Sequence, residues 1–178
     1  MAFLTTNYSN VNESNNEYTA IPTGDYECTI EQVRHDAAPS GTEFIEFRLR
    51  VRNDLDKALP KTNGKAHNRV VFDRQWKNKK TGKFNQNNLQ YVLKAAGIPE
   101  NKNIATFEDF MKVLKGKNVL VHIKNEKDTY KSDKQGTEVR RNAVDPWGYS
   151  ETKFKTEADD PFKDSSQQVD IDNNDLPF

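Results

Sequence analysis

Residues 44–52 read FIEFRLRVR, in which apolar and charged side chains alternate from residue 45 onward. A period of two places successive side chains on opposite faces of a β-strand. One face then consists of Ile45, Phe47, Leu49 and Val51, which we expect to line a core. The other face carries Arg48, Arg50 and Arg52. The stretch therefore predicts a half-buried strand with three arginines in a row on its outer face.

Four further stretches have weaker strand patterns. Tyr26, Cys28 and Ile30 alternate with polar residues directly after Ile21–Gly24, which has the composition of a turn. Together with residues 44–52, the expected strands cover residues 25–31, 69–76, 119–124 and 137–144. We expect a polar loop over residues 125–136, and Asp145–Tyr149 to close the domain.

Between the third and fourth strands the apolar period becomes helical. The first expected helix has Asn85 or Asn87 as its N-cap and an apolar stripe of Leu89, Val92, Leu93 and Ala96. A second helix is expected to begin at Thr106, where Asp109 completes a capping box. Its apolar stripe consists of Phe107, Phe110, Met111 and Leu114.

Three strands, a helical insertion and two more strands form a recognisable order. It is the order of a five-stranded oligonucleotide/oligosaccharide-binding (OB) barrel, in which the face of strands two and three binds the ligand. A small α+β sandwich would have the same order of elements. We favour the mainly β OB-fold barrel because the basic residues fall on its second and third strands.

The length and composition indicate one polar domain with appendages. The chain has 178 residues, of which 34% are hydrophobic and 30% charged, and no apolar run approaches a membrane span. The N-terminus shows no signal peptide, and a single cysteine, Cys28, fits a reducing cytoplasm. We expect a flexible arm over residues 1–20, an OB-fold domain over 21–150 and an acidic disordered tail over 151–178.

Charge is distributed unevenly along a chain whose net charge is zero. Residues 1–150 hold 24 Lys and Arg against 19 Asp and Glu, whereas residues 151–178 hold 3 against 8. Residues 48–83 hold 12 basic residues against 3 acidic ones. A basic body with an acidic tail indicates a polyanionic ligand, and a tail that can compete for the same surface.

Basic and aromatic residues gather on the second and third strands and on the turn that follows. Single-stranded nucleic acids are held by cations along the phosphates and by aromatic rings under the bases. Trp76, flanked by basic residues, is the main stacking candidate, and Phe84 is the second. The alternative is that the arginines form an ordinary solvated face and that Trp76 belongs to the core. The candidate nucleic-acid-binding residues are Arg48, Arg50, Arg52, Arg69, Arg74, Trp76, Lys77, Lys79, Lys80, Lys83 and Phe84.

The remaining aromatic residues are assigned elsewhere. Phe72, Phe107 and Phe110 are expected in the core, and Trp147 is expected to pack against the barrel.

The sequence lacks the usual signatures of an enzyme. Neither Gly82-Lys83 nor Gly116-Lys117 has the earlier glycine that a phosphate-binding loop requires. Cys28 and the three histidines lack metal-ligand spacing. We therefore expect no catalytic residues, no cofactor and no metal.

The last residues form an acidic hook with an apolar tip. The carboxylates Asp170, Asp172 and Asp175 lead into Leu176-Pro177-Phe178. Such a segment cannot bury its charges without partners, so its simplest use is to enter another protein's pocket. This ending resembles the acidic tail of bacterial single-stranded DNA-binding proteins, although Asn173 and Asn174 interrupt the acidic run and Leu176 replaces Ile.

The body resembles the single-stranded DNA-binding proteins of bacteriophages. The resemblance is carried by Pro22, Gly24 and Tyr26, by the FRLRV strand and by the NLQYVLK helix. It implies a non-enzymatic protein that coats single-stranded DNA in phage replication and recombination, in the host cytoplasm. It also implies that Phe178 enters a partner's apolar pocket while the aspartates lie along a basic ridge. The implied partners are replication, recombination and repair enzymes. Tetramerisation is not implied, because the body lacks the N-terminal pattern of the cellular proteins. Self-association of another kind stays open.

A second hypothesis is a protein–protein adaptor, or a strand-annealing helper, without a direct role on single-stranded DNA. In that case the basic face would bind an acidic surface of another protein.

Overall fold

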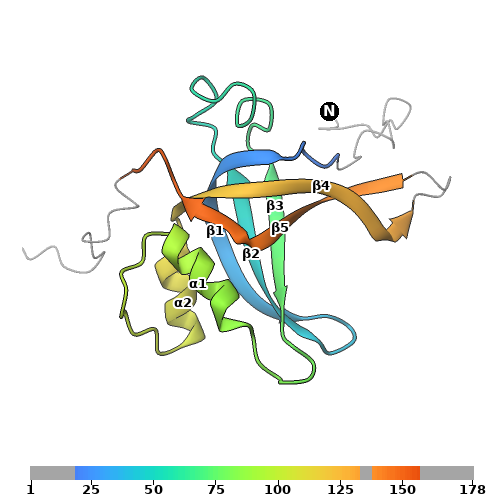
Figure 1. Ribbon diagram of the computed structural model, residues 1–178, viewed down its shortest axis with the longest axis vertical. Coiled ribbons are helices and arrows are strands. Elements are labelled where there is room, and N and C mark those ends of the chain that lie inside the picture. Colours follow the sequence, from blue (N-terminus) through green and yellow to red (C-terminus); the bar gives the residue numbers. More distant parts are fainter. Residues whose placement is uncertain (1–18, 133–137, 157–178) are drawn as a thin grey trace, which may run out of the picture.

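The computed structural model describes residues 19–132 and 138–156, which form a five-stranded antiparallel sheet with two helices (Figure 1). The predicted mainly β fold with a helical insertion is thus confirmed. The elements in chain order are β1 (Gly24–Ala37), β2 (Glu43–Val51), β3 (Val70–Trp76), α1 (Gln86–Ala95), α2 (Phe107–Leu114), β4 (Asn118–Ser132) and β5 (Glu138–Glu151). None of the helices in these ranges is long and apolar enough to cross a membrane.

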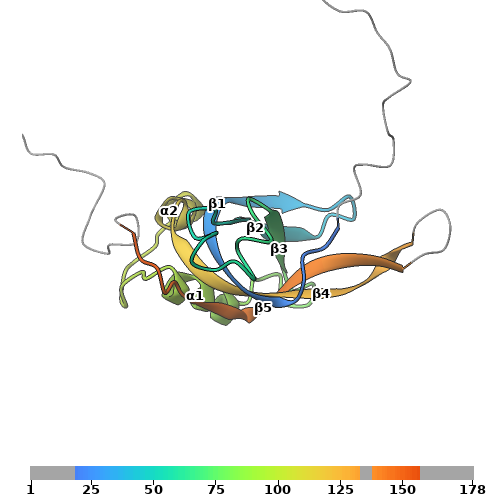
Figure 2. The same ribbon diagram turned by 90° about the horizontal axis from the view of Figure 1, so that it is seen from above.

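The sheet has the strand order β3-β2-β1-β4-β5. It curves strongly, so that β2 and β3 lie on one side of the molecule and β4 and β5 on the other (Figure 2). The two end strands are joined by side chains, since the Tyr149 hydroxyl of β5 donates a hydrogen bond of 2.8 Å to Asp73 of β3. Within the described residues the backbone ladders join only neighbours in this order.

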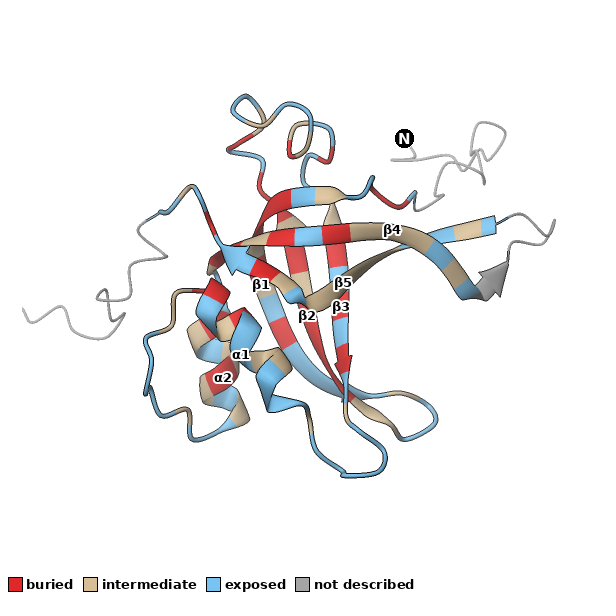
Figure 3. Cartoon of the chain, viewed as in Figure 1, coloured by how far each residue is buried: buried red, intermediate tan, exposed pale blue. Residues whose placement is uncertain are grey.

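The core lies on the concave side of the sheet, where the alternation predicted it. Ile45, Phe47, Leu49 and Val51 of β2 are all buried, as are Tyr26, Cys28 and Ile30 of the neighbouring strand β1. Figure 3 shows buried segments along both strands. After a register shift between Ile30 and Gln32, β1 continues to Ala37. This first strand is therefore longer than its sequence pattern indicated.

Both helices begin where their capping residues predicted. The Asn85 side chain accepts hydrogen bonds from the backbone of the first turn of α1. Thr106 and Asp109 form the expected reciprocal capping box at the start of α2. Helix α1 packs against β5 and α2 against β1, with Val92 and Phe110 among the side chains that they bury. The insertion thus covers part of the sheet and leaves the outer side of β2 and β3 open (Figure 1).

Strands β4 and β5 extend well beyond their predicted ends. The predicted loop over residues 125–136 is strand as far as Ser132, and Asp145–Tyr149 lies inside β5 instead of closing the domain. The added ladder pairs polar residues with one another, and Glu126 accepts a 2.7 Å ion pair from its partner Arg141. Cross-strand charge pairs can stabilise a strand without an apolar face, which the alternation rule does not detect.

Two aromatic assignments made from the sequence were wrong. Phe72 is 46% exposed, because it alternates along β3 with the buried Val71 and Asp73. Trp147 is 66% exposed, so most of its side chain faces solvent. Trp147 lies at an irregularity of the β4–β5 ladder, in which Val144 pairs with Ile123 and Tyr149 pairs with Val121. Strand β5 therefore has extra residues at this point, and they form a bulge.

Candidate nucleic-acid interface

Strand β3 turns one row of large side chains outward. Phe72, Arg74 and Trp76 are exposed, whereas the residues between them are buried. The ladder places Arg48 of β2 opposite Phe72 and Phe44 opposite Trp76. The convex surface of the first three strands, called the outer face below, consists of Gln32, Arg34, Phe44, Glu46, Arg48, Arg50, Phe72, Arg74 and Trp76.

Trp76 forms a half-exposed aromatic platform at one end of this face. Its exposed fraction is 49%, and its ring centroid lies 4.9 Å from that of the buried Phe44. The Arg74 guanidinium lies 5.1 Å from the same Phe44 ring. Phe44 therefore supports the indole from below while the indole keeps one side open to solvent. A ring held in this way can stack on a base.

A buried carboxylate holds two arginines of the outer face in place. The Glu46 side chain, only 3% exposed, accepts ion pairs of 2.7 Å from Arg34 and 2.5 Å from Arg74. Burial alone would raise the pKa of Glu46, but the hydrogen bonds from the two guanidinium groups outweigh it and lower that pKa. Glu46 is therefore ionised at neutral pH, and both guanidinium groups are oriented before any ligand arrives.

A second carboxylate, Glu31 of β1, lies between the other two arginines of the face. It is paired with Arg50, and its Oε2 atom lies 3.1 Å from Arg48 Nε. Four guanidinium groups thus share two carboxylates. The outer face keeps a surplus of positive charge, but the surplus is smaller than the count of basic and acidic residues over 48–83 indicated. Each guanidinium has five N–H donors, and an ion pair with one carboxylate leaves others available.

Arg52 does not lie on the outer face, and this part of the predicted arginine row was wrong. Its side chain is buried and forms a 2.6 Å ion pair with Asp54. It also donates 2.8 Å to the Phe154 carbonyl. The strand ends at Val51, so the alternation that exposes Arg48 and Arg50 no longer applies at the next residue. Arg52 fixes the segment that follows β5.

The basic turn after Trp76 divides into a fixed and an exposed part. Lys77 forms a 2.6 Å ion pair with Glu43 and lies 5.8 Å from the Phe84 ring centroid. Phe84 is half-buried and packs edge-on against His35 at 5.7 Å, so it supports this corner and offers less free surface than Trp76. The exposed lysines of the turn are Lys79, Lys80 and Lys83.

The remaining predicted residues lie apart from this face. Arg69 donates to the Thr19 carbonyl at the start of β3. The hook residues Asp170, Asp172, Asp175, Leu176, Pro177 and Phe178 lie outside the described residues. Conversely, the structure adds Phe44, Phe72, Arg34 and Gln32 to the face, none of which the sequence analysis had chosen.

A family model described as "Protein of unknown function (DUF669)" matches residues 4–167 of the chain. The chain belongs to the DUF669 family. The matched region includes every strand and helix of the structure, and therefore the whole outer face. None of the curated proteins matches this DUF669 chain.

Proposed function

We propose that this DUF669 protein binds single-stranded DNA, largely without sequence preference, along the outer face of β2 and β3. One observation carries the proposal: the exposed rings of Phe72 and Trp76 alternate with Arg74 on a single strand face. Rings under bases and cations along phosphates are the two features that hold single strands. Every base has a flat face to stack, which is why such binding discriminates little between sequences.

The topology supports assigning the sheet to an OB barrel. The helices lie between β3 and β4, as the insertion does in that fold, and the Tyr149–Asp73 hydrogen bond links the two ends of the sheet. In OB folds the face of strands two and three receives oligonucleotides. The outer face coincides with that surface. The protein then acts as a non-enzymatic coat on single strands during phage replication or recombination.

One observation favours a second function, an adaptor that binds an acidic or aromatic protein surface. Glu31 and Glu46 already engage the four arginines of the outer face. An interface in which charges are paired and an indole is exposed also suits a protein partner, since Trp and Arg are enriched at protein interfaces.

The two functions are separated by titrating the full-length protein with oligo-dT. A Trp147→Phe background leaves Trp76 as the only tryptophan. We expect quenching of Trp76 fluorescence by a dT oligonucleotide of about 16 nucleotides, a length that covers one OB fold. Duplex DNA of the same length should compete poorly. Absence of quenching and of a gel shift at 50 mM salt, where phosphate contacts are strongest, would refute single-strand binding and leave the adaptor.

The acidic tail is proposed to recruit replication and recombination enzymes and to cover the outer face when DNA is absent. Residues 157–178 hold seven acidic residues and one lysine. Their removal is expected to raise single-strand affinity at low salt, by about threefold to tenfold, and to have little effect at high salt, where charges are screened. Equal affinity of the truncated and full-length proteins at both salt concentrations would exclude this competition.

A further inference from the structure

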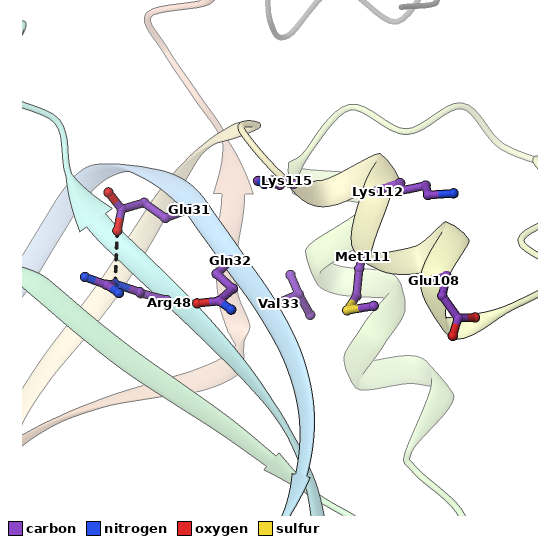
Figure 4. Close-up of a pocket in the computed structure, with 8 residues that line it drawn as sticks. All are labelled: Glu31, Gln32, Val33, Arg48, Glu108, Met111, Lys112 and Lys115. Carbon is purple, nitrogen blue, oxygen red and sulfur yellow. Dashed lines mark ion pairs between the residues drawn. The ribbon is translucent and has the colours of Figure 1, made fainter.

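A groove of about 490 Å³ lies beside the contact of β1 with helix α2 (Figure 4). This volume lies within the range of ligand pockets in proteins. Val33 and Met111 form its apolar part. The polar residues that line it are Glu31, Gln32, Arg48, Glu108, Lys112 and Lys115.

The groove is continuous with the outer face. The ladders place Phe72 opposite Arg48, and Arg48 opposite Gln32, so these three residues form one row across β3, β2 and β1. Arg48 and Gln32 also line the groove. Neighbouring strands are about 4.8 Å apart. The row therefore runs from the exposed Phe72 ring to the groove over two strand spacings.

Arg48 has a donor that its own protein does not satisfy. Its Nε atom is buried and lies 3.1 Å from Glu31, the pair drawn in Figure 4, yet the orientation does not make a hydrogen bond. The ion pair is therefore a contact of charges, and among residues 19–132 and 138–156 the N–H finds no hydrogen-bond acceptor. Buried donors without acceptors are rare in native proteins. The Arg48 side chain as a whole is 42% exposed, so much of its guanidinium remains open to a ligand oxygen in the groove.

Helix α2 contributes positive charge on the opposite wall. Lys115 points from the end of α2 toward β1 in Figure 4, whereas Lys112 lies on the rim one turn earlier. Both lysines are exposed. Glu108 lies farther along the helix, away from Arg48 (Figure 4). Arg48 of β2 and Lys115 at the end of α2 thus line the same groove from two sides.

We propose that this groove is a second nucleotide subsite for the strand that stacks on Trp76. The strand crosses β2 and β1 along the Phe72–Arg48–Gln32 row and enters the groove. There Arg48 and Lys115 bind a phosphate and the apolar part formed by Val33 and Met111 receives a base. The ligand is a single-stranded nucleic acid, so the subsite rests on the function proposed above.

The test compares Lys112→Glu/Lys115→Glu with the matched control Lys57→Glu/Lys61→Glu, which makes the same charge change on exposed lysines of the loop between β2 and β3. Affinity for oligo-dT of about 16 and about 4 nucleotides is measured against salt concentration. Each phosphate contact contributes about 0.7 to the salt slope on single strands, so loss of the phosphate bound by Lys115 should lower the slope by about 0.7 in the test variant. At 0.1 M salt this corresponds to about fivefold weaker binding of the longer strand.

Several results would overturn the subsite while leaving the proposed function standing. One is a salt dependence of 16-mer affinity that is the same in the test variant and in the control variant. Another is an equal loss on the 4-mer, because so short a strand would occupy only the Trp76 platform. Quenching of Trp76 by the 4-mer should be unchanged in both variants, which verifies that they are folded. Failure of the unaltered protein to bind any strand would refute the proposed function itself.

Discussion

Replacing Trp76 with alanine is expected to weaken binding of single-stranded DNA by about 1–3 kcal/mol, or roughly 5-fold to 150-fold, the range measured for loss of one stacked base. The indole is half exposed and supported from below by the buried Phe44. It is therefore already in position, and little entropy is lost when a base stacks on it. Fluorescence anisotropy with labelled oligo-dT measures the loss.

Two further variants make this result specific. Trp147→Ala removes a ring that is more exposed than Trp76 but lies on β5, and it should bind as the unaltered protein does. Trp76→Phe keeps a smaller ring and should retain much of the affinity. Full affinity of Trp76→Ala together with a loss in Trp147→Ala would move the interface to β5.

Phe72 should contribute in the same way, because it lies on the same strand face as Trp76. The two positions are four residues apart, about 13 Å along a strand, so they can serve different bases. The salt dependence should be nearly unaffected by either change, since neither ring contacts phosphate. This separates them from Arg74, whose loss would lower the salt slope.

The inner face of the sheet was predictable because its signal is local. Alternation along residues 44–52 identifies Ile45, Phe47, Leu49 and Val51 as core without reference to any other strand. The capping residues Asn85 and Thr106 likewise act within a few positions of their own helices. In both cases the residues that determine the structure are neighbours in the sequence.

The charge state of the outer face was not predictable, since it depends on pairing between distant residues. Glu46 meets Arg34 and Arg74, which lie 12 and 28 positions away. Strand β2 carries Arg48 on its outer side but ends at Val51. Arg52 is one residue beyond the strand, and its side chain is buried. Phe72 was assigned to the core, but the register of β3 with β2 decides which face of β3 is outside.

Asp73 is expected to make the stability of the domain depend on pH. Burial and, to a smaller extent, the neighbouring Asp145 raise the pKa of this carboxyl group, the hydrogen bond from Tyr149 opposes them, and the net pKa is about 6. In the unfolded chain the group should titrate near 3.9. Between these values the folded protein holds a proton that the unfolded chain has lost. The free energy of unfolding should therefore fall by up to about 3 kcal/mol as pH rises from about 4 to 6. Above pH 6 it should level off.

Asp73→Asn is expected to remove this dependence. The amide is uncharged at every pH and its oxygen can still accept the hydrogen bond from Tyr149. The variant should match the unaltered protein near pH 4.5 and exceed its stability by about 1–3 kcal/mol near pH 7.5. Urea unfolding at both pH values measures the difference. A slope that persists in Asp73→Asn would assign the pH dependence to other groups.

Tyr149→Phe is expected to have the opposite effect, because it removes the donor and leaves the carboxylate buried. The loss should be about 1–3 kcal/mol near pH 7.5, and smaller near pH 4.5, where Asp73 is protonated. The Tyr149–Asp73 hydrogen bond also ties β5 to the strand that carries Phe72 and Trp76. Amide exchange in β3 should therefore accelerate in this variant. Since Trp76 depends on the position of β3, binding of oligo-dT should weaken at neutral pH and recover partly as pH falls through 6.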